Sequence, residues 1–181
     1  MTRAARSALK IDVLVVSDRW KDAEKARSIV RRAVTRAAAA TRSTTPTELA
    51  IVLADDSTIR SLNRDWRGID AATNVLSFPT KSAGGPHLGD IVLAFETIAR
   101  EARRERKPFT HHAAHLAVHG FLHLVGHDHK RERDALAMEL AERNILHQLA
   151  IPDPYRAAAK PPVKQAGDRG AKRSAKRPLK S

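Results

Sequence analysis

The most constraining feature of this 181-residue sequence is a run of histidines, HHAAHLAVHGFLHLVGHDH, over residues 111–129. Seven of the nine histidines of the chain lie in this run. Histidine has only an intermediate tendency to be buried, so core packing alone does not account for such a density. The apolar residues between the histidines predict a helix over 109–125, which begins after Pro108 and ends before Gly126.

Two of these histidines, His119 and His123, are four residues apart, so a helix projects both imidazoles from one face. Gly126 can adopt the left-handed conformation that reverses the chain, which would bring His129 back towards the pair. Three imidazoles make three corners of a tetrahedral zinc site and leave the fourth for water, as in catalytic zinc sites. We therefore predict one Zn²⁺ per chain, bound by His119, His123 and His129 at the end of the His-rich helix.

Two residues beside the predicted ligands have open roles. His127 lies two positions before His129 in the same turn, so it can replace or supplement that ligand. Asp128 can orient a ligand imidazole from outside the metal shell, as carboxylates often do, or cap the next helix. The chain has no cysteine, which excludes thiolate ligands and a cysteine nucleophile.

The hydrophobic periodicity along the chain predicts an α+β fold with one small mixed β-sheet of about four strands and about five helices packed on it. We expect residues 1–155 to form a single domain, since roughly 100–200 residues is the usual domain size. The expected strands are 11–16, 48–54, 74–78 and 88–95, and the expected helices are 22–40, 55–66, 96–106, 109–125 and 132–149.

The charge of the chain is strongly positive, with 33 Lys and Arg against 20 Asp and Glu and a net charge of +13. Residues 156–181 hold nine basic residues, one acidic residue and few large apolar side chains, which predicts a disordered basic tail. The charge indicates a polyanionic partner, most simply RNA. The tail either contacts RNA by releasing counterions or only solubilises the chain.

Two further features of composition limit the function. Aromatic residues make up only 4% of the chain, which argues against a single-strand binder that works mainly by base stacking. No apolar segment reaches the ~18 residues of a membrane span, so we expect no membrane association and a cytoplasmic location.

Three motifs occur in the order LNRDWRGIDAATNVLSFP (62–79), LGDIVL (88–93) and HGFLHLVGHDH (119–129). Together they resemble the YbeY-type metal-dependent endoribonucleases of bacteria. The resemblance implies a single-strand-specific, zinc-dependent endoribonuclease that acts in 16S rRNA 3′-end maturation and ribosome quality control. Its partners would be the 16S rRNA precursor and the small ribosomal subunit, and its zinc ligands carry over onto His119, His123 and His129.

The same resemblance assigns a catalytic role to Arg67, which stands in the family's R-G-x-D motif. A guanidinium suits this role because its planar fork binds phosphate oxygens in pairs and does not lose its charge. One competing interpretation is a surface ion pair of Arg67 with Asp65 or Asp70, and Arg64 is the local competitor for the catalytic role.

Two other functions fit parts of the pattern. A ribosome-associated RNA-binding protein with a structural zinc would share the charge, but it would close the metal site with a fourth protein ligand. A metzincin-like zinc peptidase would share the spacing H-x3-H-x2-G-x2-H. Those peptidases carry a glutamate general base where this chain has Gly120. A peptidase active site in this chain would therefore lack its proton acceptor.

Overall fold

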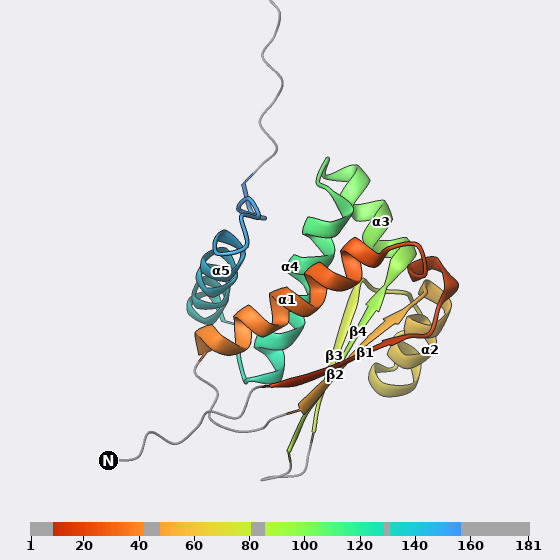
Figure 1. Ribbon diagram of the computed structural model, residues 1–181. Coiled ribbons are helices and arrows are strands. Elements are labelled where there is room, and N and C mark those ends of the chain that lie inside the picture. Colours follow the sequence, from red (N-terminus) through yellow and green to blue (C-terminus); the bar gives the residue numbers. More distant parts are fainter. Residues whose placement is uncertain (1–8, 42–47, 81–85, 129–130, 157–181) are drawn as a thin grey trace, which may run out of the picture.

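The computed structural model describes residues 9–41, 48–80, 86–128 and 131–156 (Figure 1). Its centre is one mixed sheet with the strand order β1-β2-β4-β3. The pairs β1–β2 and β2–β4 are parallel, and β3 runs antiparallel to β4 at the edge. The strands are β1 (Lys10–Val15), β2 (Glu48–Ala54), β3 (Val75–Pro79) and β4 (His87–Ala94).

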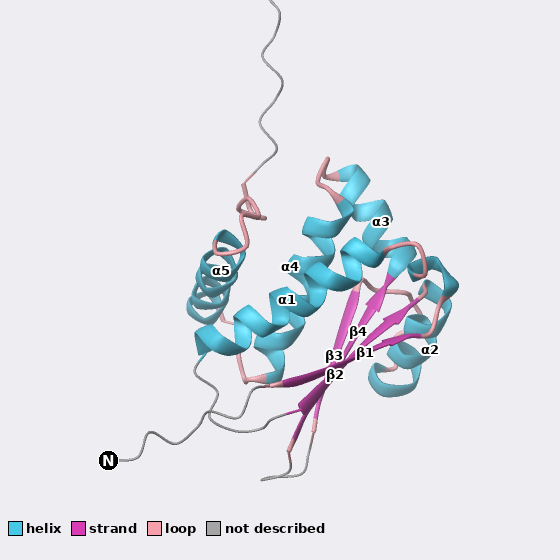
Figure 2. Cartoon of the chain, in the orientation of Figure 1, coloured by secondary structure: helices cyan, strands magenta, loops and turns pink. Residues whose placement is uncertain are grey.

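Helices cover both faces of this sheet (Figure 2). Helices α1 and α4 pack on one face and on each other, α2 packs on the opposite face, and α5 packs against α1 and α4 away from the sheet. The α+β prediction is confirmed, and each predicted element is present with ends that differ by at most two residues. The helices are α1 (Glu24–Thr41), α2 (Asp56–Arg67), α3 (Phe95–Arg104), α4 (Phe109–Leu124) and α5 (Glu132–His147), with a short 3-10 turn at Asp18–Trp20.

The two central strands carry the core because both of their faces are covered. Ile51 and Ile91 belong to the cluster between the sheet and helices α1 and α4, and neither is exposed. Leu76 and Val92 belong to a smaller cluster on the α2 face. Each fully buried side chain of this kind stabilises the fold by roughly 1.5–3 kcal/mol. A strand that is covered on both faces consists mostly of such side chains, so a short apolar run in the sequence predicts it.

The C-terminal end of α4 turns sharply, as the sequence predicted. Gly126 has a φ of 92°, in the left-handed region that glycine enters without steric cost. The amide of Gly126 donates to the carbonyl of His123 at 3.1 Å, and the amide of His127 donates to the carbonyl of Leu122 at 2.9 Å. These bonds close the last turn of the helix and direct the following residues back along it.

Within the described part of the chain, no helix is both long enough and apolar enough to cross a membrane.

Candidate metal centre

Helix α4 brings His119 and His123 together on the side that does not pack on the sheet. Their Nε2 atoms lie 3.1 Å apart, and their rings are nearly perpendicular at 82° with centroids 4.6 Å apart. The opposite side of the helix packs against the sheet through buried residues such as Val118 and Phe121. The four-residue spacing therefore produces the paired imidazoles that the sequence predicted.

The other ring nitrogens of the two histidines have fixed partners. Nδ1 of His119 lies 2.8 Å from Oε1 of Glu142, and Nδ1 of His123 lies 3.0 Å from the carbonyl oxygen of His127. A carboxylate and a carbonyl only accept hydrogen bonds, so each Nδ1 carries the proton and donates it. In the neutral imidazole the Nε2 atom then holds a lone pair. When both rings are neutral, the unprotonated Nε2 atoms of His119 and His123 face one another.

This geometry suits a divalent metal ion. Two Zn–N bonds of about 2.0–2.1 Å at a tetrahedral angle place the nitrogen atoms roughly 3.3–3.4 Å apart, close to the distance between the two Nε2 atoms. The donor set, two imidazoles with no thiolate, is one that zinc accepts.

The third predicted ligand, His129, lies outside the described residues. Among residues 9–41, 48–80, 86–128 and 131–156, no group of three or more His, Asp or Glu side chains is arranged to hold a metal. The hydrogen bond from His123 to the His127 carbonyl shows that the chain after Gly126 runs back beside the imidazole pair. The assignment of His129 stays a prediction that this reversal supports.

The two residues with open roles lie in this reversed segment. His127 contacts His123 through its backbone carbonyl, so one contribution of His127 to the site does not require its imidazole. Both His127 and Asp128 are half-buried. Their suggested side-chain roles beside the metal stay predictions.

A residue that the sequence reasoning missed, Glu142, lies directly behind the imidazole pair. This glutamate of α5 is fully buried. Its carboxylate accepts hydrogen bonds from Nε2 of His115 at 2.9 Å, from Nδ1 of His119 at 2.8 Å and from the hydroxyl of Tyr155. A sequence signal was available, because Glu142 lies on the same stripe of α5 as the buried Met138 and Ile145.

The electrostatics of Glu142 follow from these contacts. Burial raises the pKa of its carboxyl, but the hydrogen bonds from His115 and His119 outweigh burial and lower the pKa to about 2. Burial and the neighbouring carboxylate raise the pKa of Tyr155 above its ordinary value. Glu142 is therefore an ionised acceptor, and Tyr155 stays a protonated donor to it.

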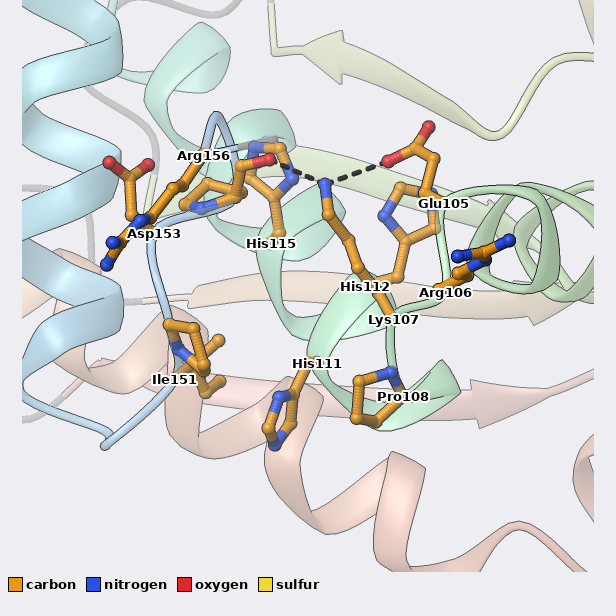
Figure 3. A pocket seen from close by; sticks show the side chains of 12 residues that line it. Glu105, Arg106, Lys107, Pro108, His111, His112, His115, Ile151, Asp153 and Arg156 are labelled. Atoms are coloured by element: carbon orange, nitrogen blue, oxygen red, sulfur yellow. Dashed lines mark hydrogen bonds and ion pairs between the residues drawn. The ribbon is translucent and has the colours of Figure 1, made fainter. Parts of the chain in front are cut away.

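A separate pocket of about 390 Å³ lies beyond His115, towards the start of α4 (Figure 3). One of its walls is the segment 151–156, and Lys107 bridges the pocket edge by donating to Glu105 and to the carbonyl of Pro154. His119 and His123 do not line this pocket. The histidines of α4 that do line it are His111, His112 and His115.

Arg67 lies at the end of α2, on the sheet face opposite α4. Its proposed ion-pair partners are engaged elsewhere, since Asp70 pairs with Arg60 at 2.7 Å and Asp65 pairs with Arg64 at 3.1 Å. Within the described ranges, Arg67 makes no ion pair and its side chain is exposed. The surface ion-pair interpretation is thus not favoured.

The edge strand β3 separates Arg67 from the imidazole pair. Next to Arg67, the ring of Trp66 packs edge-on against Phe78 of β3, with centroids 5.7 Å apart. On the other face of the strand, the hydroxyl of Ser77 donates to the carbonyl of Gly120 at 3.0 Å. Two adjacent residues of β3 therefore connect the end of α2 to the helical turn that carries His119.

Comparison with known proteins identifies the group to which these motifs belong. A family model described as "Endoribonuclease YbeY" matches residues 15–150, which include both the imidazole pair and Arg67. The chain belongs to the YbeY endoribonuclease family. The family that the three sequence motifs resembled is thereby confirmed.

Relatives that carry the YbeY name cover most of this chain. "Endoribonuclease YbeY" of Rhodopseudomonas palustris (strain BisB18) is 52% identical over 152 residues, which are 80% of this chain and 90% of that protein. The protein of the same name from Nitrobacter winogradskyi is 51% identical over 160 residues, 83% of this chain and 84% of its own length. A solution structure of a Thermotoga maritima protein is 21% identical, covers 81% of this chain and 99% of that one, and has a TM-score of 0.46.

Proposed function

We propose that this chain is a zinc-dependent endoribonuclease that hydrolyses phosphodiesters of single-stranded RNA, with the 16S rRNA precursor of the small ribosomal subunit as its substrate. Membership of the YbeY family supports the reaction class. The observation that carries the metal chemistry is the pair of Nε2 atoms of His119 and His123, which face one another at 3.1 Å. Because ribosomal RNA is made in the bacterial cytoplasm, the proposal places the chain there.

The metal would be held by His119, His123 and His129, one ion per chain. In this proposal each Nε2 binds the metal, because Nδ1 of His119 and Nδ1 of His123 already donate to Glu142 and to the His127 carbonyl. When bound, zinc supplies a Lewis acid that activates water near neutral pH and polarises a phosphoryl oxygen. Three protein ligands leave a position open for this chemistry, unlike a structural site with four.

Arg67 is proposed to bind the phosphate group that is cleaved. Its guanidinium stays charged at any physiological pH and can contact two phosphate oxygens at once. Negative charge grows on these oxygens during the displacement at phosphorus, so the contact strengthens towards the transition state and lowers the barrier. Arg67 is exposed at the end of α2, across the edge strand β3 from the imidazole pair, so the proposal requires the RNA strand to pass over this edge of the sheet.

The test of this function compares the wild type with Arg67→Ala. We expect the wild type to hold one zinc per chain and to cleave single-stranded 16S precursor RNA. Arg67→Ala should keep its zinc and its fold but show a kcat about 10²–10³-fold lower, the usual effect of removing one charge-stabilising group. Zinc content, circular dichroism and single-turnover cleavage measure the three quantities.

Arg64→Ala is the matched control, because Arg64 lies in the same last turn of α2 and pairs with Asp65. This variant should cleave at close to the wild-type rate. Unchanged turnover in Arg67→Ala would remove Arg67 from the mechanism, and loss of folding would show that the arginine is structural.

We also propose that residues 157–181, which lie outside the described residues, bind RNA through their basic side chains. Deleting them should weaken RNA binding and reduce the slope of log K against log salt by about 0.7 for each phosphate that the tail neutralises. Fluorescence anisotropy with a single-stranded RNA at several salt concentrations measures both effects. Equal slopes for the full and shortened chains would contradict the proposed role of the tail.

A further inference from the structure

The carboxylate of Glu142 joins three parts of the chain at a fully buried point. Its donors are His115 and His119 from α4, which lie 27 and 23 residues away in sequence, and Tyr155 from the segment after α5. A buried carboxylate is strongly destabilising unless hydrogen-bond donors compensate it, and these three donors supply that compensation. An apolar residue at this position of α5 would fill the core without that cost.

The contact to His119 has a chemical consequence that a core interaction lacks. Oε1 of Glu142 accepts from Nδ1 of His119 at 2.8 Å, so the imidazole keeps its proton on Nδ1 and its lone pair on Nε2. Nε2 is the atom that faces His123 at 3.1 Å. The opposite tautomer would leave Nδ1 without a proton against a carboxylate and would place a proton on Nε2, towards the metal position.

From this geometry we propose that Glu142 is a positioning residue for the zinc site, which fixes both the tautomer and the orientation of the ligand His119. The inference rests on the proposed function, because it presumes that His119 binds zinc. Carboxylates that hold the second nitrogen of a ligand imidazole also make the ligand more basic and strengthen its metal bond.

The other donors hold Glu142 in its place. His115 and Tyr155 both reach Oε2, which leaves Oε1 to His119. Two contacts hold Tyr155 in turn. Lys107 donates a hydrogen bond to the carbonyl of the preceding residue, Pro154, and the guanidinium carbon of Arg143 lies 5.0 Å from the centroid of the Tyr155 ring. The carboxylate therefore cannot turn away from His119 without breaking its hydrogen bonds to two other side chains.

The first experiment measures zinc affinity, in competition with a chromophoric chelator, for wild type, Glu142→Gln and Glu132→Gln. Glutamine keeps the shape of the side chain but lacks the negative charge. Its amide NH2 is a donor, whereas the groups that surround Glu142 are themselves donors and need an acceptor. Glu142→Gln should bind zinc 10–100-fold more weakly, the usual effect of removing such a partner. Glu132 is exposed at the start of the same helix, so its variant should bind zinc as tightly as the wild type.

The second experiment reads the tautomer directly, and its wild-type measurement needs no variant that could fail to fold. Nitrogen-15 NMR of the zinc-free wild type should show the His119 ring protonated at Nδ1. In folded Glu142→Gln the same ring should show a mixture of tautomers. A merely structural role of Glu142 would leave the tautomer of His119 the same in both proteins.

The outcomes separate this inference from the proposed function. Equal zinc affinity of wild type and folded Glu142→Gln, or a wild-type His119 protonated at Nε2, overturns the inference while the zinc site stands. A wild type that binds no zinc overturns the proposed function and this inference with it.

Discussion

His123→Ala is expected to abolish both zinc binding and RNA cleavage. The variant removes one of the two Nε2 atoms that face one another at 3.1 Å, so the proposed zinc site loses one of its three ligands. Three-histidine zinc sites depend on every ligand because only three protein atoms hold the ion. A metal ion contributes several kcal/mol to the transition state, so cleavage should fall by about 10³-fold or more.

The measurement combines zinc content by elemental analysis with cleavage of single-stranded 16S precursor RNA. His111→Ala is the matched control, because His111 lies on the same helix but lines the separate pocket at its start. It should retain zinc and cleavage. A metal-free His123→Ala protein that cuts RNA at the parental rate would contradict the zinc-dependent mechanism.

X-ray absorption on the zinc-loaded wild type separates the enzyme from the binding-protein alternative. Three histidine nitrogens and one non-protein oxygen are expected for a catalytic site. Four protein donors would instead support a structural zinc in a ribosome-associated protein.

Local patterns predicted the elements of the fold, because each depends on residues close together in sequence. Helix α4 could be bounded in advance by Pro108 and Gly126, and its imidazole pair follows from a four-residue spacing. The strand order and the antiparallel pairing of β3 were not predicted, since they depend on how elements distant in sequence pack.

The candidate site shows the same division. The spacing of His119 and His123 indicates their pairing, but no local pattern indicates Glu142, because it meets His119 only when α5 packs on α4. The sequence suggests a role only for the side chain of His127, whereas in the structure its backbone carbonyl accepts a hydrogen bond from His123, which no residue pattern encodes. Arg67 came from family resemblance alone, since it lies on another helix across the edge of the sheet.

Gly120 distinguishes this site from a zinc peptidase, because a side chain at this position meets the sheet. A Cβ added to Gly120 would lie 2.9 Å from Cγ2 of Ile91, 3.0 Å from the hydroxyl oxygen of Ser77 and 3.3 Å from Cγ2 of Val75. Helix α4 therefore approaches the sheet as closely as glycine permits. The position at which metzincin-like peptidases carry their general base here faces the core.

Gly120→Glu is accordingly expected to unfold the protein rather than to create a peptidase. The variant places a carboxylate between α4, β3 and β4, where the three nearest side chains are Ile91, Ser77 and Val75 and none is a cation. Burying an unpaired charge together with the steric overlap should cost more than about 3 kcal/mol, a large part of the stability of a small domain. Gly120→Ala should be destabilised less, because overpacking costs about 1–3 kcal/mol and the gain in helix propensity returns up to about 1 kcal/mol.

Urea unfolding followed by circular dichroism measures these changes, with Thr110→Glu as a control for a glutamate in the first turn of the same helix. That variant should be as stable as the wild type, since a carboxylate near a helix N-terminus interacts favourably with the helix dipole. A Gly120→Glu protein with wild-type stability that hydrolyses casein would show that α4 can move away from the sheet and would restore the peptidase interpretation. Loss of stability in Gly120→Glu, with Thr110→Glu unaffected, would instead show that the packing of α4 on β3 and β4 leaves no room for the general base of a peptidase at this position.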